Sequence, residues 1–142
     1  MMWNLVEPIL MVILALMSLI AFYIYFERLL FYRSLPLREH KSKSKLEREL
    51  TKGLYLIASI ASNAPYVGLL GTVLGIMHTF YTMGQGGLAD TLKIMVGLSL
   101  ALKATAVGLL VAIPATFLYN HLIRKVREII LEWEEINGRE GN

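Results

Sequence analysis

Hydrophobic residues dominate three long stretches of this chain, and each stretch lacks Asp, Glu, Lys and Arg altogether. The charge-free intervals cover residues 8–26, 53–89 and 104–123. A hydrocarbon core of about 30 Å takes about 20 helical residues to cross, so each interval is long enough to span a membrane. The pattern predicts an all-α membrane protein of a single domain, 1–142, with three transmembrane helices. The predicted spans lie at about residues 3–31, 54–83 and 92–120.

Composition supports a membrane protein and argues against several other classes. Of the 142 residues, 56% are hydrophobic and only 18% are charged, whereas soluble domains carry roughly 25% charged residues. The absence of cysteine excludes disulfides and thiolate metal sites. The N-terminus has no basic segment ahead of its apolar run, so we do not expect a cleaved signal peptide. Without a phosphate-binding loop, nucleophile elbow or metalloprotease motif, we expect no enzyme, metal or cofactor.

Basic residues beside the apolar stretches predict the orientation of the chain, and their position gives no support to nucleic-acid binding. From Arg28 to Lys52, across the loop at 32–53, the sequence has eight basic residues and three acidic ones. Loops rich in Lys and Arg stay in the cytoplasm. We therefore expect a cytoplasmic loop, a periplasmic N-terminus, a periplasmic turn at 84–91 and a cytoplasmic C-terminus.

Helical extensions are expected on the cytoplasmic side of the membrane. Leu46, Leu50 and Leu54 recur every four residues, so the second helix should begin near Leu46 and enter the membrane near Leu54. The third helix should continue as an amphipathic C-terminal helix within residues 121–142. Gly138 is expected to end it.

Small and polar residues occupy one face of each of the last two predicted spans. In the second span this face carries Gly68, Thr72, Gly75 and Thr79, with Gly71 beside it. In the third span it carries Ala101, Thr105, Gly108 and Ala112. Lipid gives helices no hydrophobic reason to associate, so small faces indicate close backbone contact. We expect tight helix packing here, and a kink in the second span at Pro65.

Thr72 and Thr105 lie near the middle of their spans, each on its small-residue face. A threonine hydroxyl can donate to a carbonyl of its own helix, and its role is then purely structural. It can also hold water or face the carboxylate of a partner in a cavity. The residue types alone leave both interpretations open.

Few charged or titratable side chains fall near the spans. Lys103 costs roughly 2.5–3.5 kcal/mol to insert at a bilayer centre, so it is a functional candidate unless it snorkels to an interface. Glu27 and Arg28 suit an interfacial ion pair. His78 has no visible acidic partner and gives weak support for a proton relay. The last two spans contain no Asp or Glu, so a proton channel built from them needs a carboxylate from a partner chain.

Two segments resemble signatures of a known family, the MotA/TolQ/ExbB proton channels. Residues 63–77 read NAPYVGLLGTVLGIM, which is similar to the second-helix signature of that family. Residues 102–115 read LKATAVGLLVAIPA, which is similar to its third-helix signature. The pair Glu27–Arg28 and the basic loop also fit, and the short length most resembles compact ExbB proteins.

The resemblance implies a function and a set of partners. ExbB-like subunits form a pentamer in the bacterial inner membrane, with the second and third helices around a central pore. A single-span partner, ExbD, carries a membrane Asp inside the pore. TonB passes the energy of proton flow to outer-membrane receptors for iron chelates and vitamin B12. The same resemblance implies that Thr72 and Thr105 face the pore, with the small-residue faces packed around it.

One position departs from the family pattern. Many members carry Glu five residues before the third-helix threonine, where this chain has Leu100. A mechanism that uses such a Glu is therefore in doubt, and Lys103 lies on the wrong face to serve the pore threonines. Two alternatives stay open: a TolQ-type subunit for envelope integrity, and a membrane scaffold that conducts no ions.

Overall fold

The computed structural model describes residues 2–37, 42–86 and 90–140, and its elements are four α-helices. They are α1 (Met2–Arg33), α2 (Lys43–Leu50), α3 (Leu54–Gln85) and α4 (Thr91–Glu140). Three segments are long and apolar enough to cross a membrane, namely Asn4–Arg33, Leu54–Gln85 and Thr91–Gly138. The prediction of an all-helical fold with three candidate membrane-spanning helices is confirmed.

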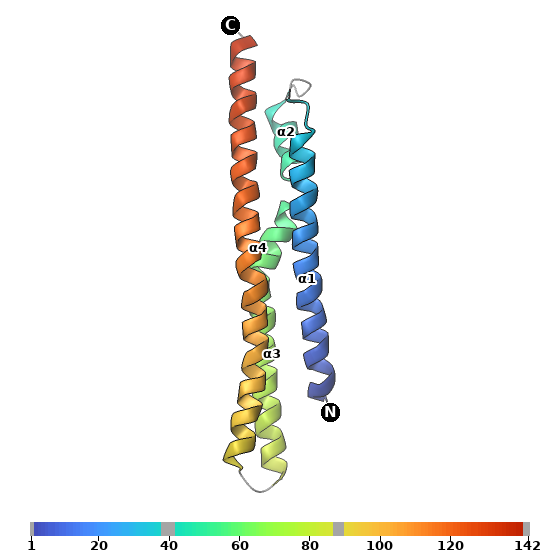
Figure 1. Ribbon diagram of the computed structural model, residues 1–142, viewed down its shortest axis with the longest axis vertical. Coiled ribbons are helices and arrows are strands. Elements are labelled where there is room, and N and C mark those ends of the chain that lie inside the picture. The colour runs from blue at the N-terminus through green and yellow to red at the C-terminus, as the bar shows by residue number, and fades with distance from the viewer. Residues whose placement is uncertain (1, 38–41, 87–89, 141–142) are drawn as a thin grey trace.

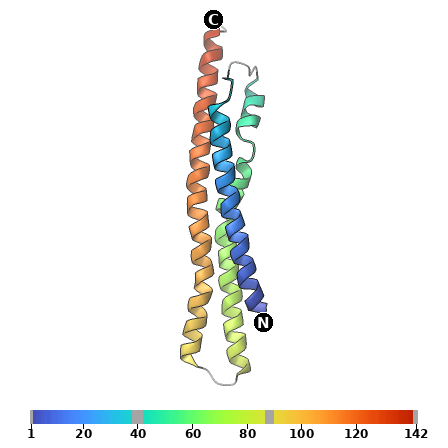
Figure 2. The same ribbon diagram turned by 45° about the vertical axis from the view of Figure 1, so that its right-hand side comes forward.

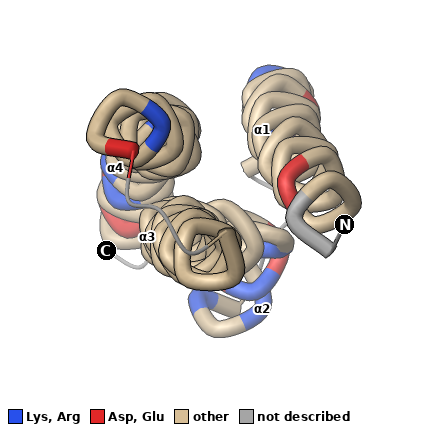
Figure 3. The backbone as a smooth tube through the Cα atoms, turned by 90° about the horizontal axis from the view of Figure 1, so that it is seen from below, with Lys and Arg blue, Asp and Glu red and all other residues tan. Residues whose placement is uncertain are grey.

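A long antiparallel hairpin of α3 and α4 forms the frame of the molecule, and α1 packs along it (Figure 1). α1 runs in the same direction as α4, and its N-terminus lies part of the way along the hairpin (Figure 2). Viewed along the bundle, α1, α3 and α4 occupy the corners of a triangle (Figure 3). The short helix α2 packs on α4 at the end of the bundle that carries the C-terminus.

Gly53 separates α2 from α3. Its backbone has φ 82° and ψ −9°, in the left-handed region that glycine adopts readily because it has no Cβ. The prediction of one helix running from near Leu46 into the membrane was wrong, because this left-handed residue turns the chain between two helices. Leu46, Leu50 and Leu54 are nevertheless all buried, so the spacing of the leucines still marks an inward face.

α4 is a single unbroken helix of 50 residues, about 75 Å long at 1.5 Å per residue. It continues through Gly138 to Glu140, so the prediction that Gly138 ends the helix was wrong. A glycine inside a helix costs only about 1 kcal/mol relative to alanine, which is too little to stop a long helix by itself. α3 likewise continues through Pro65, and the kink expected there stays a prediction.

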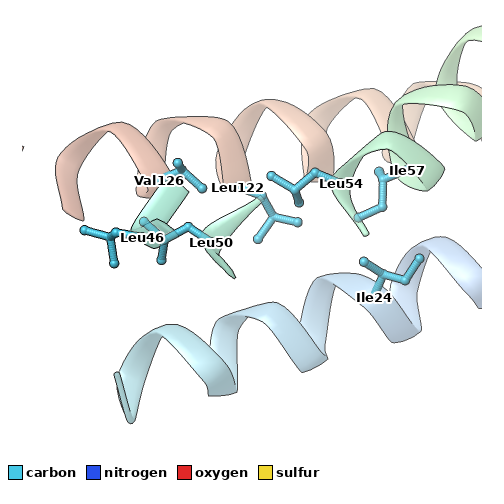
Figure 4. Packing of buried hydrophobic residues seen from close by; sticks show 7 residues of the cluster. All are labelled: Ile24, Leu46, Leu50, Leu54, Ile57, Leu122 and Val126. Carbon is cyan, nitrogen blue, oxygen red and sulfur yellow. The ribbon is translucent and has the colours of Figure 1, made fainter. Parts of the chain in front are cut away.

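Large apolar side chains pack together at the end of the bundle that carries α2 (Figure 4). All four helices contribute to this cluster, which contains Ile24, Leu46, Leu50, Leu54, Ile57, Leu122 and Val126. Farther along the hairpin, the buried positions between α3 and α4 are mostly Ala and Gly. Side-chain packing therefore closes one end of the bundle, and close backbone contact holds the rest.

Gly53→Ala should lower the free energy of unfolding by about 1–2 kcal/mol, the cost of the left-handed conformation for an L-residue. A Cβ at this position would meet only Ile24 Cγ2, at an ordinary 3.6 Å, so the cost is conformational rather than steric. Thermal unfolding of the purified protein in mild detergent measures the effect. Gly84→Ala is the control, because Gly84 lies inside α3 with nothing within 4 Å of its Cβ. Equal unfolding midpoints for the two variants would show that the left-handed turn is not required.

Candidate functional site

The interface between α3 and α4 is built from residues too small to keep the backbones apart. A Cβ at Gly68 would lie 2.7 Å from the Ala104 carbonyl oxygen. A Cβ at Gly108 would lie 2.7 Å from the Ala64 carbonyl oxygen and 2.9 Å from Gly68 Cα. Real Cβ atoms do not approach other atoms so closely, so the two helices touch through their main chains. This is the contact that small residues make possible in lipid.

The small-residue face extends along both helices. Buried positions on it are Ala64, Gly68, Gly71 and Gly75 of α3, and Ala101, Ala104, Gly108 and Ala112 of α4. Ala64 and Ala104 were not among the residues selected from the sequence. Each precedes a selected glycine, Gly68 or Gly108, by four positions, and that spacing of small residues was the signal that could have found them.

Thr72 and Thr105 meet in the middle of this face. Their hydroxyl groups hydrogen-bond to each other across the interface. Thr72 Oγ1 also lies within hydrogen-bonding distance of two carbonyl oxygens, Ala101 at 3.0 Å and Gly68 at 3.4 Å, and Thr105 Oγ1 lies 3.5 Å from the same Gly68 oxygen. Thr72 is only 7% exposed. The structure thus joins the two threonines, predicted from separate helices, into one polar site surrounded by Ala and Gly.

The chemistry of this site is that of hydroxyl groups held among carbonyls. A hydroxyl offers one donor and two acceptor lone pairs, and its hydrogen can rotate between partners. Among the described residues, the hydrogen-bond partners of the two threonines are carbonyls and each other. The pair therefore offers hydroxyl hydrogen bonds and contains no titratable group of its own.

Gly71 is the point where α1 joins the helix pair. A Cβ on Gly71 would lie 2.6 Å from Ala104 Cβ and 3.1 Å from Leu10 Cδ1. Leu10 of α1 is buried in this contact. Because Gly71 and Ala104 directly precede Thr72 and Thr105 in sequence, α1 packs against the two helices beside the threonine pair.

Lys103 lies apart from the threonines and contacts α1. Its Nζ lies 3.5 Å from Oε1 of Glu7, and the two side chains are 56% and 26% exposed. Glu7 was not predicted as a site residue, since only its place near the N-terminus was noted. The pairing depends on how far α1 is shifted along α4, which the sequence does not give.

Glu27 and Arg28 form the ion pair expected from the sequence, and Arg28 also binds α2. Arg28 donates from Nε and Nη2 to the two carboxylate oxygens of Glu27, both at 2.6 Å. Its Nη1 donates to the main-chain oxygen of Glu49 at 2.7 Å, and Tyr32 Oη donates to the oxygen of Leu50 at 2.5 Å. These oxygens belong to the last turn of α2, where carbonyls lack helical partners and the dipole favours a cation. Arg28 and Tyr32 therefore hold the C-terminal end of α2 on α1.

A second ion pair fastens the other end of α2. Lys43 Nζ lies 2.5 Å from Glu134 Oε1 of α4, and both side chains are about half exposed. The hydrogen bond that Lys43 donates to the Glu134 carboxylate, followed by the attraction of the opposite charge, raises the pKa of Lys43. Exposed pairs of this kind contribute little to stability. Arg28, which is only 5% exposed, is the stronger attachment.

The remaining candidates are spread along the bundle. Pro65 and His78 are half-buried on α3, and Leu100 is exposed on α4. Among the described residues, no three His, Asp or Glu side chains group closely enough to hold a metal. Three apolar spans, joined through small residues and covered with exposed large apolar side chains, define a multi-pass membrane protein.

Comparison with known proteins identifies the family. Residues 37–135 match the MotA/TolQ/ExbB proton channel family. The chain is 62% identical to the biopolymer transport protein ExbB of Aquifex aeolicus over 125 residues, which cover 88% of this chain and 84% of that protein. It is 51% identical to ExbB of Helicobacter pylori strain J99 over 120 residues, 84% of this chain and 83% of that protein. The chain belongs to the MotA/TolQ/ExbB proton channel family.

A TolQ relative shares a shorter segment. The Tol-Pal system protein TolQ of Haemophilus influenzae is 45% identical over 73 residues, which cover 51% of this chain and 32% of that protein. The ExbB relatives above are therefore matched over a larger share of both chains.

Gly68→Ala should lower the stability of the folded protein by about 1–3 kcal/mol, the usual cost of an added methylene in a packed interior. The added methyl meets a backbone oxygen, which cannot move aside as a side chain can. Gly138→Ala is the matched control in α4, because nothing lies within 4 Å of a Cβ there. Thermal unfolding in mild detergent compares the two. An unchanged midpoint for Gly68→Ala would contradict the main-chain contact between α3 and α4.

Arg28→Lys should loosen α2 while preserving the charge. A hydrogen bond to a charged group contributes about 1.5–3 kcal/mol, and about 1.4 kcal/mol corresponds to a tenfold change in an equilibrium. Amide hydrogen exchange in residues 43–50 should therefore accelerate at least about tenfold. Arg33→Lys serves as the control, since Arg33 is exposed at the end of α1. If both variants exchange as slowly as the unaltered protein, Arg28 does not hold α2.

Proposed function

We propose that this chain is the multi-span subunit of a bacterial inner-membrane motor that uses the proton motive force to energise TonB-dependent outer-membrane transport of iron chelates and vitamin B12. The observation that carries the proposal is the Thr72–Thr105 hydroxyl pair on the small-residue face of α3 and α4. Family membership and extensive identity with ExbB proteins support it.

In this proposal, copies of the chain assemble as a homo-oligomer, a pentamer, around a pore lined by α3 and α4. Large apolar side chains on the outer surfaces of these helices support burial in lipid or against other copies. They include Leu69, Leu70, Leu109, Leu110 and Ile113. The basic loop and α2 face the cytoplasm, and the turn between α3 and α4 faces the periplasm.

The proton-carrying carboxylate comes from a single-span, ExbD-like partner with an Asp in its membrane segment. In the described part of the chain, Thr72 and Thr105 bond to each other and to carbonyls, and their hydroxyls can serve either protonation state of an Asp. They donate to the carboxylate and accept from the protonated acid. One proton crossing 100 mV releases about 2.3 kcal/mol, and a TonB-like protein conveys that energy onward.

A TolQ-type role in envelope integrity is the second candidate, favoured by the shared segment with the Haemophilus protein. The two roles use the same site and differ in partners. Gentle purification from native membranes, followed by identification of the co-purifying single-span protein, distinguishes an ExbD–TonB complex from a TolR–TolA complex.

The proposal is tested by removing each hydroxyl at constant shape. Thr72→Val and Thr105→Val should reduce proton-driven uptake of an iron chelate at least about tenfold, because a hydrogen bond to a charged group contributes about 1.5–3 kcal/mol and each 1.36 kcal/mol is about tenfold in rate. Thr116→Val is the control, since the Thr116 hydroxyl donates to the Ala112 oxygen of its own helix, at 2.8 Å. Assembly of each variant is verified by size-exclusion chromatography.

The outcomes separate a motor from a scaffold that conducts no ions. A motor loses uptake in both site variants and keeps it in the Thr116 control. If both site variants assemble and still energise uptake, the hydroxyl pair is not part of a proton path, and the scaffold becomes the better description.

A further inference from the structure

Two polar contacts join α1 to α4, and they share one sequence offset. The first links Glu7 to Lys103 at 3.5 Å. The second is a hydrogen bond of 2.9 Å between Tyr25 Oη and His121 Nδ1. In both contacts the partners are 96 residues apart. The two helices run in the same direction (Figure 1), so the common offset means that they lie side by side without slipping between the two contacts.

The two contacts are separated by a whole number of helical turns, over a length similar to the hydrocarbon thickness of a membrane. Eighteen residues separate Glu7 from Tyr25, and eighteen separate Lys103 from His121. Eighteen residues make five turns, so both contacts fall on the same face of each helix, about 27 Å apart. No Asp, Glu, Lys or Arg lies between them on either helix. The two contacts therefore lie at the two ends of a shared apolar segment about 27 Å long.

Glu7 and Lys103 carry opposite charges, and each needs a partner where water is scarce. An ionised Lys on a spanning helix is costly unless it is paired, and an oppositely charged carboxylate is its natural partner. One helical turn after Glu7, Leu10 is buried with its Cδ1 close to Gly71, which keeps this part of α1 close to α3. The Glu7–Lys103 contact adds a link from the same part of α1 to α4.

We propose that the Glu7–Lys103 ion pair fixes the register of α1 along α4, with Tyr25–His121 as the second fixed point. The pair would position the N-terminal half of α1 against Gly71 and Ala104. The inference concerns helix placement in the membrane, and it stands whether or not the chain moves protons.

A double-mutant cycle on the full-length chain in mild detergent tests the pair. The variants are Glu7→Gln, Lys103→Met, the double neutral variant, and the charge exchange Glu7→Lys with Lys103→Glu. Removing one partner of a low-dielectric ion pair leaves an uncompensated charge, whereas removing both is often nearly neutral. We therefore expect each single variant to unfold several degrees below the unaltered protein. The double neutral and exchanged variants should recover at least half of that loss.

Additive losses in the double variant, or an exchanged variant worse than both singles, would overturn the proposal. A second measurement keeps it testable if a variant fails to fold. The chain has no cysteine, so Glu7→Cys with Lys103→Cys introduces the only two thiols. A short bismaleimide should link them within one chain, whereas the control pair, Glu7→Cys with Leu92→Cys, should not react. Linking in the control pair alone would also overturn the register. Neither readout involves proton movement, so each proposal can fail independently of the other.

Discussion

Lipid provides no hydrophobic driving force for two helices to associate. The structure therefore depends on the close backbone contact through which α3 and α4 pair. At Gly68 and Gly108 the backbones are so close that a methyl group on either would strike main-chain atoms of the other helix. Dispersion summed over these main-chain contacts, together with hydroxyl-to-carbonyl hydrogen bonds, holds the pair. The glycines therefore determine where Thr72 and Thr105 can meet, because hydroxyls on a wider interface would not reach each other.

Three polar side chains in or near the spans each contact another helix. Thr72 reaches a carbonyl of α4, Arg28 reaches the main chain of α2, and Lys103 reaches α1. An unsatisfied polar group costs several kcal/mol in hydrocarbon, so each contact removes a penalty and connects two elements at once. These three polar groups consequently help to specify how the helices are arranged.

Features that depend on one helix could be predicted from the sequence, whereas contacts between helices far apart in the sequence could not. Membrane crossing requires a minimum apolar length, so charge-free intervals were sufficient to predict three helices. Helical periodicity placed Thr72 and Thr105 on small faces, and the structure joined them. The break at Gly53 was missed because a glycine after a polar helix is also compatible with continuation. The contacts of Arg28 with α2 and of Lys103 with α1 were missed because they depend on how α1 is placed against its neighbours, which periodicity within one helix does not encode.

The continuity of α4 has a mechanical consequence. Thr105 and the last residue of the helix, Glu140, are 35 positions apart with no break between them, a distance of about 52 Å. A tilt of about 5° at the level of Thr105 would swing the far end through about 4–5 Å, close to the pitch of one helical turn. A rigid tilt of α4 at the level of Thr105 would therefore displace side chains beside α2 much farther than those of the small-residue face, because they lie farther from the tilt point.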